Sequence, residues 1–151
     1  MSAQPETHKP SITIASIDLL SSALRSLDNA LVASRASDKY VAAHLAALRA
    51  AAALLSVSAK PHNRRPTSAW TLVARVAPDL AEWAGFFAAS AGKRAAAEAG
   101  ISGVVTEREA DDLVRDAHQF IDAVSCKLGV SRQLELPLTS NVIEFRPRST
   151  P

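Results

Sequence analysis

Apolar residues recur at helical spacing along most of the chain, and no stretch alternates apolar and polar residues for long. A spacing of three to four residues predicts amphipathic helices, whereas alternation would predict strands. The first pattern predicts a helix over residues 15–34 with a single apolar stripe. The stripe consists of Ile17, Leu20, Leu24, Leu27 and Leu31. The pattern therefore favours an all-α fold.

The next helical pattern is rich in alanine and runs to about Val57. Ser37 and Asp38 are suitable N-cap residues for its start. Alanine has the highest intrinsic helix propensity, and its small side chain lets neighbouring helices approach closely. We therefore expect a central helix with neighbours on several sides. His44 lies on this helix, and we expect a hydrogen bond with a neighbouring residue rather than a catalytic or ligand-binding role.

Residues 60–66 contain two prolines and a basic run, which predict a loop that ends the central helix. A short helix follows, and Pro78 either kinks it or opens a new one. Helical pattern then resumes to about Ala99, with Gly100 as a suitable stop. At helical spacing, the aromatic side chains of this region are expected in the core rather than stacked on bases. They are Trp70, Trp83, Phe86 and Phe87.

The last helix has the clearest start signal, because Thr106 and Glu109 have the spacing of a capping box. Gly129 is a natural stop, since glycine adopts the left-handed conformation without strain. Cys126 falls in an apolar helical pattern and is expected to be buried and inert. The predicted organisation is a disordered N-terminus over residues 1–12, a bundle of four to five helices over 13–129, and a disordered or extended tail over 130–151.

Composition and charge exclude several classes of function. The formal net charge of +2 does not indicate a general nucleic-acid binder, although the sequence pI is about 9.0. A single cysteine excludes an intramolecular disulfide and a cysteine-rich zinc site, and we expect no cofactor or metal. Signal-peptide and membrane-span patterns are not found, which fits a cytoplasmic protein. In the basic loop, Lys60, Arg64 and Arg65 either contact phosphates or simply solubilise the loop.

Three stretches together resemble an actinobacterial branch of the HEPN-like helical domains. They read YVAAHLAALR at residues 40–49, AWTLVARVAPDLAEWAGFF at 69–87, and TEREADDL at 106–113. The aromatic and proline positions fit in order, and the resemblance covers most of residues 15–129. It implies an all-α bundle of four to five helices, and often a homodimer.

Many HEPN proteins are ribonucleases whose signature is an arginine, four to six further residues and a histidine near the start of the last helix. Here Arg115 and His118 have only two residues between them, so the sequence departs from that signature. Residues three apart on a helix still share a face. Asp111 and Asp122 lie four residues from Arg115 and His118 and are candidate ion-pair partners. The alternatives are a catalytic pair and a solvated polar face with ordinary ion pairs.

Residues 133–138 read QLELPL and resemble the hexapeptide with which bacterial replication and repair proteins bind the DNA sliding clamp. The resemblance makes Gln133 the anchoring glutamine. It makes Leu134 the flanking apolar residue, and Glu135 occupies the small or acidic position. Leu136 and Leu138 fill the apolar pocket, and Leu138 replaces the phenylalanine of the commoner pentapeptide.

The residue types of this hexapeptide suit such binding. A glutamine amide both donates and accepts hydrogen bonds, and leucines two residues apart project to the same side of an extended chain. Pro137 favours an extended conformation at Leu136, which lowers the ordering cost of binding. The alternative is that the leucines pack on the bundle or pair as a short strand.

Two functions are therefore carried forward. The first is a non-enzymatic adaptor of DNA replication, repair or mutagenesis. Its tail binds the sliding clamp and its bundle binds a protein partner, such as a DNA polymerase or accessory protein. The second is a HEPN-type ribonuclease or toxin–antitoxin component that acts on RNA through Arg115 and His118.

Overall fold

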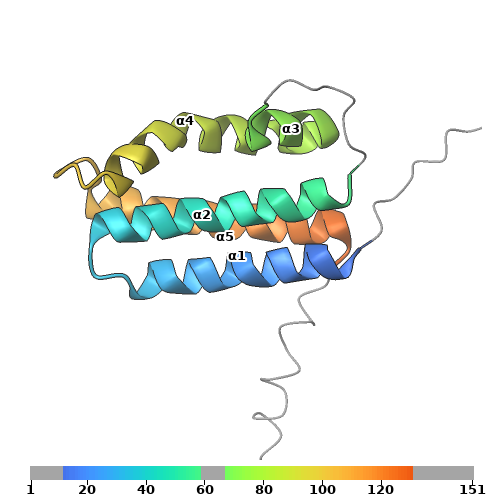
Figure 1. Ribbon diagram of the computed structural model, residues 1–151, viewed down its shortest axis with the longest axis horizontal. Helices are drawn as coiled ribbons and strands as arrows, with labels where there is room; N and C mark the ends of the chain where they lie inside the picture. The colour runs from blue at the N-terminus through green and yellow to red at the C-terminus, as the bar shows by residue number, and fades with distance from the viewer. Residues whose placement is uncertain (1–11, 59–66, 131–151) are drawn as a thin grey trace, which may run out of the picture.

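The computed structural model describes residues 12–58 and 67–130 (Figure 1). Within these ranges every regular element is helical, as the sequence predicts. The elements are α1 (Ile14–Val32), α2 (Ala36–Ser56), α3 (Ala69–Val76), the short 3₁₀ helix η1 (Pro78–Leu80), α4 (Ala81–Glu98) and α5 (Glu107–Leu128). None of the described helices is long and apolar enough to cross a membrane.

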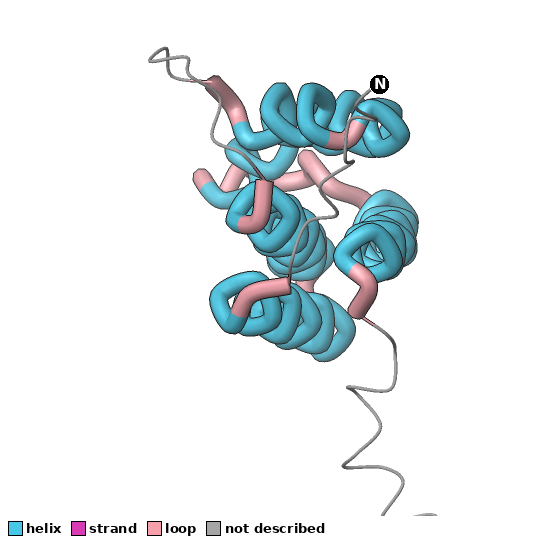
Figure 2. The backbone as a smooth tube through the Cα atoms, turned by 90° about the vertical axis from the view of Figure 1, so that its right-hand side faces the viewer, coloured by secondary structure: helices cyan, strands magenta, loops and turns pink. Residues whose placement is uncertain are grey.

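Helix α2 is the axis of the bundle, because it contacts each of the other four α-helices. Figures 1 and 2 show α2 and α5 side by side in the middle, with α1 on one side and α3 with α4 on the other. The side chains that allow this arrangement are small. Six alanines of α2 have no exposed surface: Ala43, Ala46, Ala47, Ala50, Ala51 and Ala53.

Aromatic rings fill the space between α2, α3, α4 and α5. Phe87 is fully buried, and its ring stacks on Trp70 with 5.0 Å between centroids. Phe120 of α5 approaches Phe87 at 5.3 Å, and Trp83 approaches Phe87 at 6.0 Å. Offset and tilted aromatic pairs of this kind add about 0.5–1.5 kcal/mol each beyond their buried area. This cluster holds α3 and α4 against the α2–α5 pair.

Polar contacts tie α2 to its neighbours at the edges of the core. On one side, Arg49 donates hydrogen bonds to the buried Ser26 hydroxyl at 2.5 Å and to the Ser22 carbonyl of α1 at 3.4 Å. At its N-terminal end, the Lys39 ammonium lies 2.9 Å from the Asp111 carboxylate of α5. Each contact joins two helices that already pack through apolar residues, so the contacts fix their relative rotation.

Helix ends follow local sequence rules at several of the predicted places. The Thr106 capping box is present, and Pro78 occupies the first turn of η1, which leads directly into α4. Gly100 and Gly129 both adopt positive φ angles, of 78° and 71°. At α5 the Gly129 N–H donates to the Cys126 carbonyl, and the Val130 N–H donates to the Ser125 carbonyl. These two bonds form a Schellman motif, which satisfies carbonyls at the helix end.

The start of α2 differs from the prediction. The helix begins at Ala36, and Arg35 occupies the N-cap position without a side-chain cap hydrogen bond. Ser37 and Asp38 therefore lie inside the first turn and do not cap the helix. An acidic side chain in this turn is still favourable, because the N-terminal end of a helix dipole is positive.

Burial corrects three further expectations. The predicted α1 stripe is only partly internal, because Leu20 and Leu27 are buried while Leu31 is 62% exposed. Phe86 is 42% exposed rather than in the core, and Cys126 is exposed rather than buried. Successive residues of a helix are rotated by about 100°, and on α4 the inward position belongs to Phe87, so Phe86 lies at the edge of the core.

We predict that Ala47→Leu destabilises the bundle by about 1–3 kcal/mol or more, because the site has no space for additional carbon atoms. Urea unfolding followed by far-ultraviolet circular dichroism measures the change. Ala95→Leu, on the exposed side of α4, is the matched control and should stay within about 0.5 kcal/mol of the wild type. Equal stability of the two variants would show that α2 is not closely packed.

Candidate functional site

Helix α5 carries most of the candidate functional residues, and different faces of it serve different contacts. Its buried face packs on α2 through residues such as Leu113 and Ile121. The remaining faces are polar and line two surface hollows. One hollow lies toward α1, and the other lies toward α4.

The hollow toward α1 contains both residues of the ribonuclease hypothesis, Arg115 and His118. It has a volume of about 370 Å³ and an apolar base of Leu27, Leu31 and Val114. The Arg115 and His118 side chains are 64% and 52% exposed, so water reaches both groups freely.

Arg115 and His118 each pair with a different carboxylate of their own helix. Arg115 lies 2.5 Å from Asp112, one turn toward the N-terminus. His118 Nδ1 lies 3.6 Å from Asp122, one turn toward the C-terminus, as predicted. The predicted pairing of Arg115 with Asp111 is wrong, because Asp111 pairs with Lys39 of α2. The carboxylate partners of the two side chains therefore lie in opposite directions along α5.

His44 is a structural residue in the aromatic cluster. It is 1% exposed, and its Nε2 lies 3.1 Å from the Phe87 carbonyl oxygen, so Nε2–H donates to that oxygen. Nδ1 has no hydrogen-bond partner among the described residues. Burial lowers the pKa of His44, which keeps the imidazole neutral. The ring thus links α2 to α4, in agreement with the expectation that a neighbour satisfies it.

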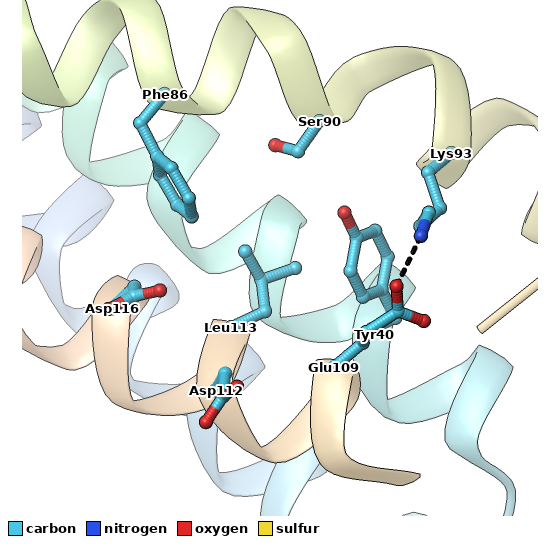
Figure 3. Close-up of a pocket in the computed structure, with 8 residues that line it drawn as sticks. All are labelled: Tyr40, Phe86, Ser90, Lys93, Glu109, Asp112, Leu113 and Asp116. Atoms are coloured by element: carbon cyan, nitrogen blue, oxygen red, sulfur yellow. Dashed lines mark hydrogen bonds and ion pairs between the residues drawn. The ribbon is translucent and has the colours of Figure 1, made fainter. Parts of the chain in front are cut away.

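The hollow toward α4 was not apparent from the sequence. It has a volume of about 260 Å³ and lies between α4 and α5, with Tyr40 of α2 at its base (Figure 3). Phe86 projects into it from α4, and Asp116 faces it from α5. We call it the α4–α5 groove. Its lining residues are Tyr40, Phe86, Ser90, Lys93, Glu109, Asp112, Leu113 and Asp116.

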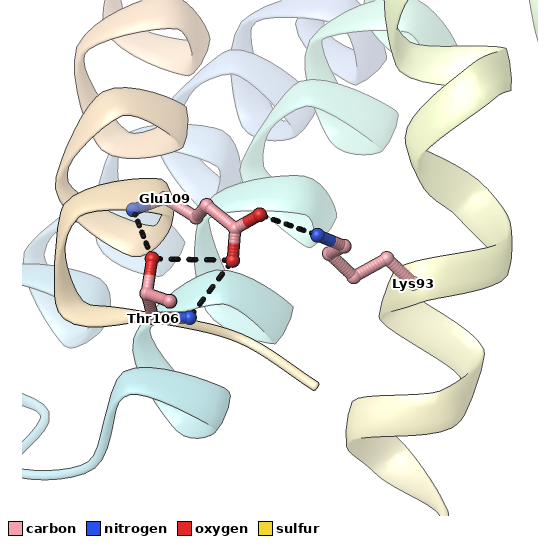
Figure 4. Close-up of polar contacts among 3 residues, drawn as sticks. All are labelled: Lys93, Thr106 and Glu109. Carbon is pink, nitrogen blue, oxygen red and sulfur yellow. Dashed lines mark hydrogen bonds and ion pairs between the residues drawn. The ribbon is translucent and has the colours of Figure 1, made fainter. Parts of the chain in front are cut away.

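One end of the groove is closed by a network at the start of α5 (Figure 4). Glu109 accepts hydrogen bonds from the Thr106 N–H at 2.8 Å and from the Lys93 ammonium of α4 at 2.5 Å. These contacts, the Lys93 hydrogen bond foremost, lower the pKa of Glu109 to about 2. One carboxylate therefore caps α5 and also joins α5 to α4.

The predicted nucleic-acid contacts Lys60, Arg64 and Arg65 lie outside the described residues, as does the predicted clamp-binding segment 133–138. They stay predictions. Among the described residues, no group of three or more histidine, cysteine, aspartate or glutamate side chains is arranged to hold a metal ion.

A family model of SAV_6107-like HEPN domains matches residues 30–125. The chain belongs to this HEPN family. The match begins near the end of α1 and ends within the last turn of α5, so it includes α2, α3 and α4 in full. No curated protein and no solved structure matches the chain.

Within this HEPN domain, Arg115 and His118 depart from the expected ribonuclease signature in their spacing. Arg115 and His118 are separated by two residues, and each is paired with a separate carboxylate. Membership of the family therefore establishes the helical domain, and any activity has to be argued from the residues themselves.

We predict a pH-dependent contribution of Glu109 to stability. Because its folded pKa of about 2 lies below the ordinary value of 4.5, ionised Glu109 stabilises the folded state above about pH 4.5. That contribution is lost as the pH falls from 4.5 toward 2. Glu109→Gln retains a capping-box residue but removes the charge.

Urea unfolding at several pH values tests this prediction. The wild type should be more stable than Glu109→Gln at neutral pH, and the difference should shrink toward pH 2. Asp18→Asn, at an exposed position of α1 beyond the first turn, is the matched control and should show little difference at any pH. A wild-type advantage that is independent of pH would contradict the role of the carboxylate charge.

Proposed function

We propose that the chain is a non-enzymatic adaptor of DNA replication, repair or mutagenesis. Its segment 133–138 binds the bacterial sliding clamp, and its HEPN bundle binds a protein partner, such as a DNA polymerase or accessory protein. The observation that carries the proposal is the QLELPL sequence, in which every position has the residue type of a clamp-binding hexapeptide.

The end of α5 supports this proposal, because the last described residues before the segment are well anchored. Gly129 closes the helix in the left-handed conformation, and Val130 is still hydrogen-bonded to Ser125 at 2.9 Å. Lys127 lies 2.7 Å from Asp79 and so joins the last turn of α5 to η1. Gln133 is the third residue after Val130. A clamp bound at this segment would therefore be held close to a well-anchored helix end.

The geometry of Arg115 and His118 supports a non-catalytic function. General acid–base catalysis needs a group positioned at the reacting proton, and a partly buried site strengthens its electrostatic effect. Both side chains are instead more than half exposed, Arg115 is ion-paired with Asp112, and His118 Nδ1 lies 3.6 Å from Asp122. Exposed ion pairs of this kind are common on helix surfaces and need no catalytic explanation.

We predict that the full chain binds purified bacterial sliding clamp, measured by isothermal titration calorimetry. Gln133→Ala combined with Leu136→Ala should weaken binding by about tenfold or more, because it removes the anchoring amide and a pocket-filling leucine. Thr139→Ala with Ser140→Ala, just beyond the hexapeptide, is the matched control and should bind like the wild type. Equal affinity of all three proteins would refute the proposal.

A ribonuclease or toxin–antitoxin function is the second candidate. The observation that favours it is the shared hollow, in which Lys39, Arg115 and His118 bring three potential cations to one surface. If the purified chain cleaves RNA and the His118→Ala variant does not, the ribonuclease function is supported and the adaptor function is refuted. If both proteins leave RNA intact while the wild type binds the clamp, the adaptor stands.

A further inference from the structure

The residues that line the α4–α5 groove have no role in the function proposed above. Helix α4 packs closely on α2 and α3, but its backbone does not pack closely on α5. The space between α4 and α5 is bridged by side chains over the base formed by Tyr40 and Leu113 (Figure 3). Phe86 lines this space and remains 42% exposed, which is unusual for a large aromatic residue. The groove thus offers an aromatic wall to a ligand.

The opposite wall offers the Asp116 carboxylate, on which the nearby Arg115 charge acts without forming an ion pair. Of the three acidic residues of the groove, Glu109 pairs with Lys93, and Asp112 pairs with Arg115. Asp116 makes no hydrogen bond or ion pair with any residue of the ranges 12–58 and 67–130. It is also half-buried, and burial raises its pKa. Bringing a cation to Asp116 would offset this cost of desolvation.

Phe86 and Asp116 together indicate which chemical group would bind in the groove. A guanidinium group stacks on an aromatic face and donates two parallel hydrogen bonds to a carboxylate. A lysine ammonium lacks both the plane and the fork of donors. Nucleic acid is disfavoured, because its phosphates would meet the acidic wall formed by Asp112 and Asp116. We therefore favour a segment of a protein over nucleic acid as the ligand. Arginine and aromatic residues are the types enriched at the centres of protein interfaces.

We propose that the α4–α5 groove binds an arginine side chain of a protein partner, seated between the Phe86 ring and the Asp116 carboxylate. The proposal rests on the adaptor function and gives the chemistry by which the bundle recognises its partner. The Ser90 hydroxyl lines the same groove and already donates to the Phe87 carbonyl at 2.9 Å, so only its acceptor capacity is left for the partner.

The probe is N-acetyl-L-arginine amide, titrated into the full chain and followed by NMR. Its neutral isostere, N-acetyl-L-citrulline amide, is the matched control ligand. We expect saturable shifts at Phe86 and Asp116 with the arginine amide, and at least about fivefold weaker binding of the citrulline amide, because the charge-assisted and cation–π contacts are lost. Equal binding of the two amides, or shifts confined to the hollow around Asp111, would overturn the proposal.

Two variants test the assigned residues without threatening the fold. Asp116→Asn preserves the size of the side chain, and Phe86→Leu preserves its apolar character. Each variant should lower the affinity for the arginine amide by about fivefold or more. Asp122→Asn makes the same chemical change outside the groove and should have no effect. Unchanged affinity in both groove variants would overturn the assignment.

A third variant distinguishes a partner from the chain itself, whose segment 145–148 contains two arginines. If the variant with Arg146→Ala and Arg148→Ala binds the arginine amide more tightly than the wild type does, the chain's own segment competes for the groove. That result would refute the assignment to a partner protein. Unchanged affinity supports an external partner. The clamp titration is independent of this experiment, because the variant with Gln133→Ala and Leu136→Ala retains the groove. Failure of one proposal can therefore be told apart from failure of the other.

Discussion

The small size of the interior side chains of α2 is the constraint on which the rest of the structure depends. Six alanines of α2 have no exposed surface, so four other helices can contact it. Alanine supplies little apolar area of its own, and the aromatic cluster around Phe87 and Phe120 fills the space between α2, α4 and α5 instead. Because α4 and α5 both pack on α2 and not closely on each other, the groove between them follows from the same constraint.

Helix α5 joins this scaffold to the proposed functions. Its two ends are fixed by the Thr106 capping box and by the Gly129 Schellman motif, and ion pairs from Lys39 and Lys127 connect it to α2 and η1. One polar face presents Arg115 and His118, each in contact with a carboxylate of α5. Another presents Asp116, which makes no hydrogen bond or ion pair with the described residues and lines the same groove as the exposed Phe86 ring. A single rigid helix can thus support partner binding on its side and direct the following segment from its end.

The sequence predicted features that depend on local interactions. The capping box at Thr106 and the stop at Gly129 each depend on a few neighbouring residues, and both are present. Pro78, which was expected either to kink a helix or to open a new one, opens η1. The errors arose where tertiary packing decides. Cys126 lies two residues from both Val124 and Leu128, which places it on the opposite face from these buried residues. Phe86 was assigned to the core from the helical spacing of the aromatic residues, although its neighbour Phe87 occupies the inward position. The α4–α5 groove joins residues from three helices, and no local pattern reveals it.

Hydrogen exchange of the full chain, measured alone and with saturating sliding clamp, tests the division between a stable bundle and a separate clamp-binding segment most directly. The account predicts new protection at residues 133–138, with the protection of α2 and of the Arg115–His118 face unchanged. New protection at the Arg115–His118 face, with none at residues 133–138, would contradict it.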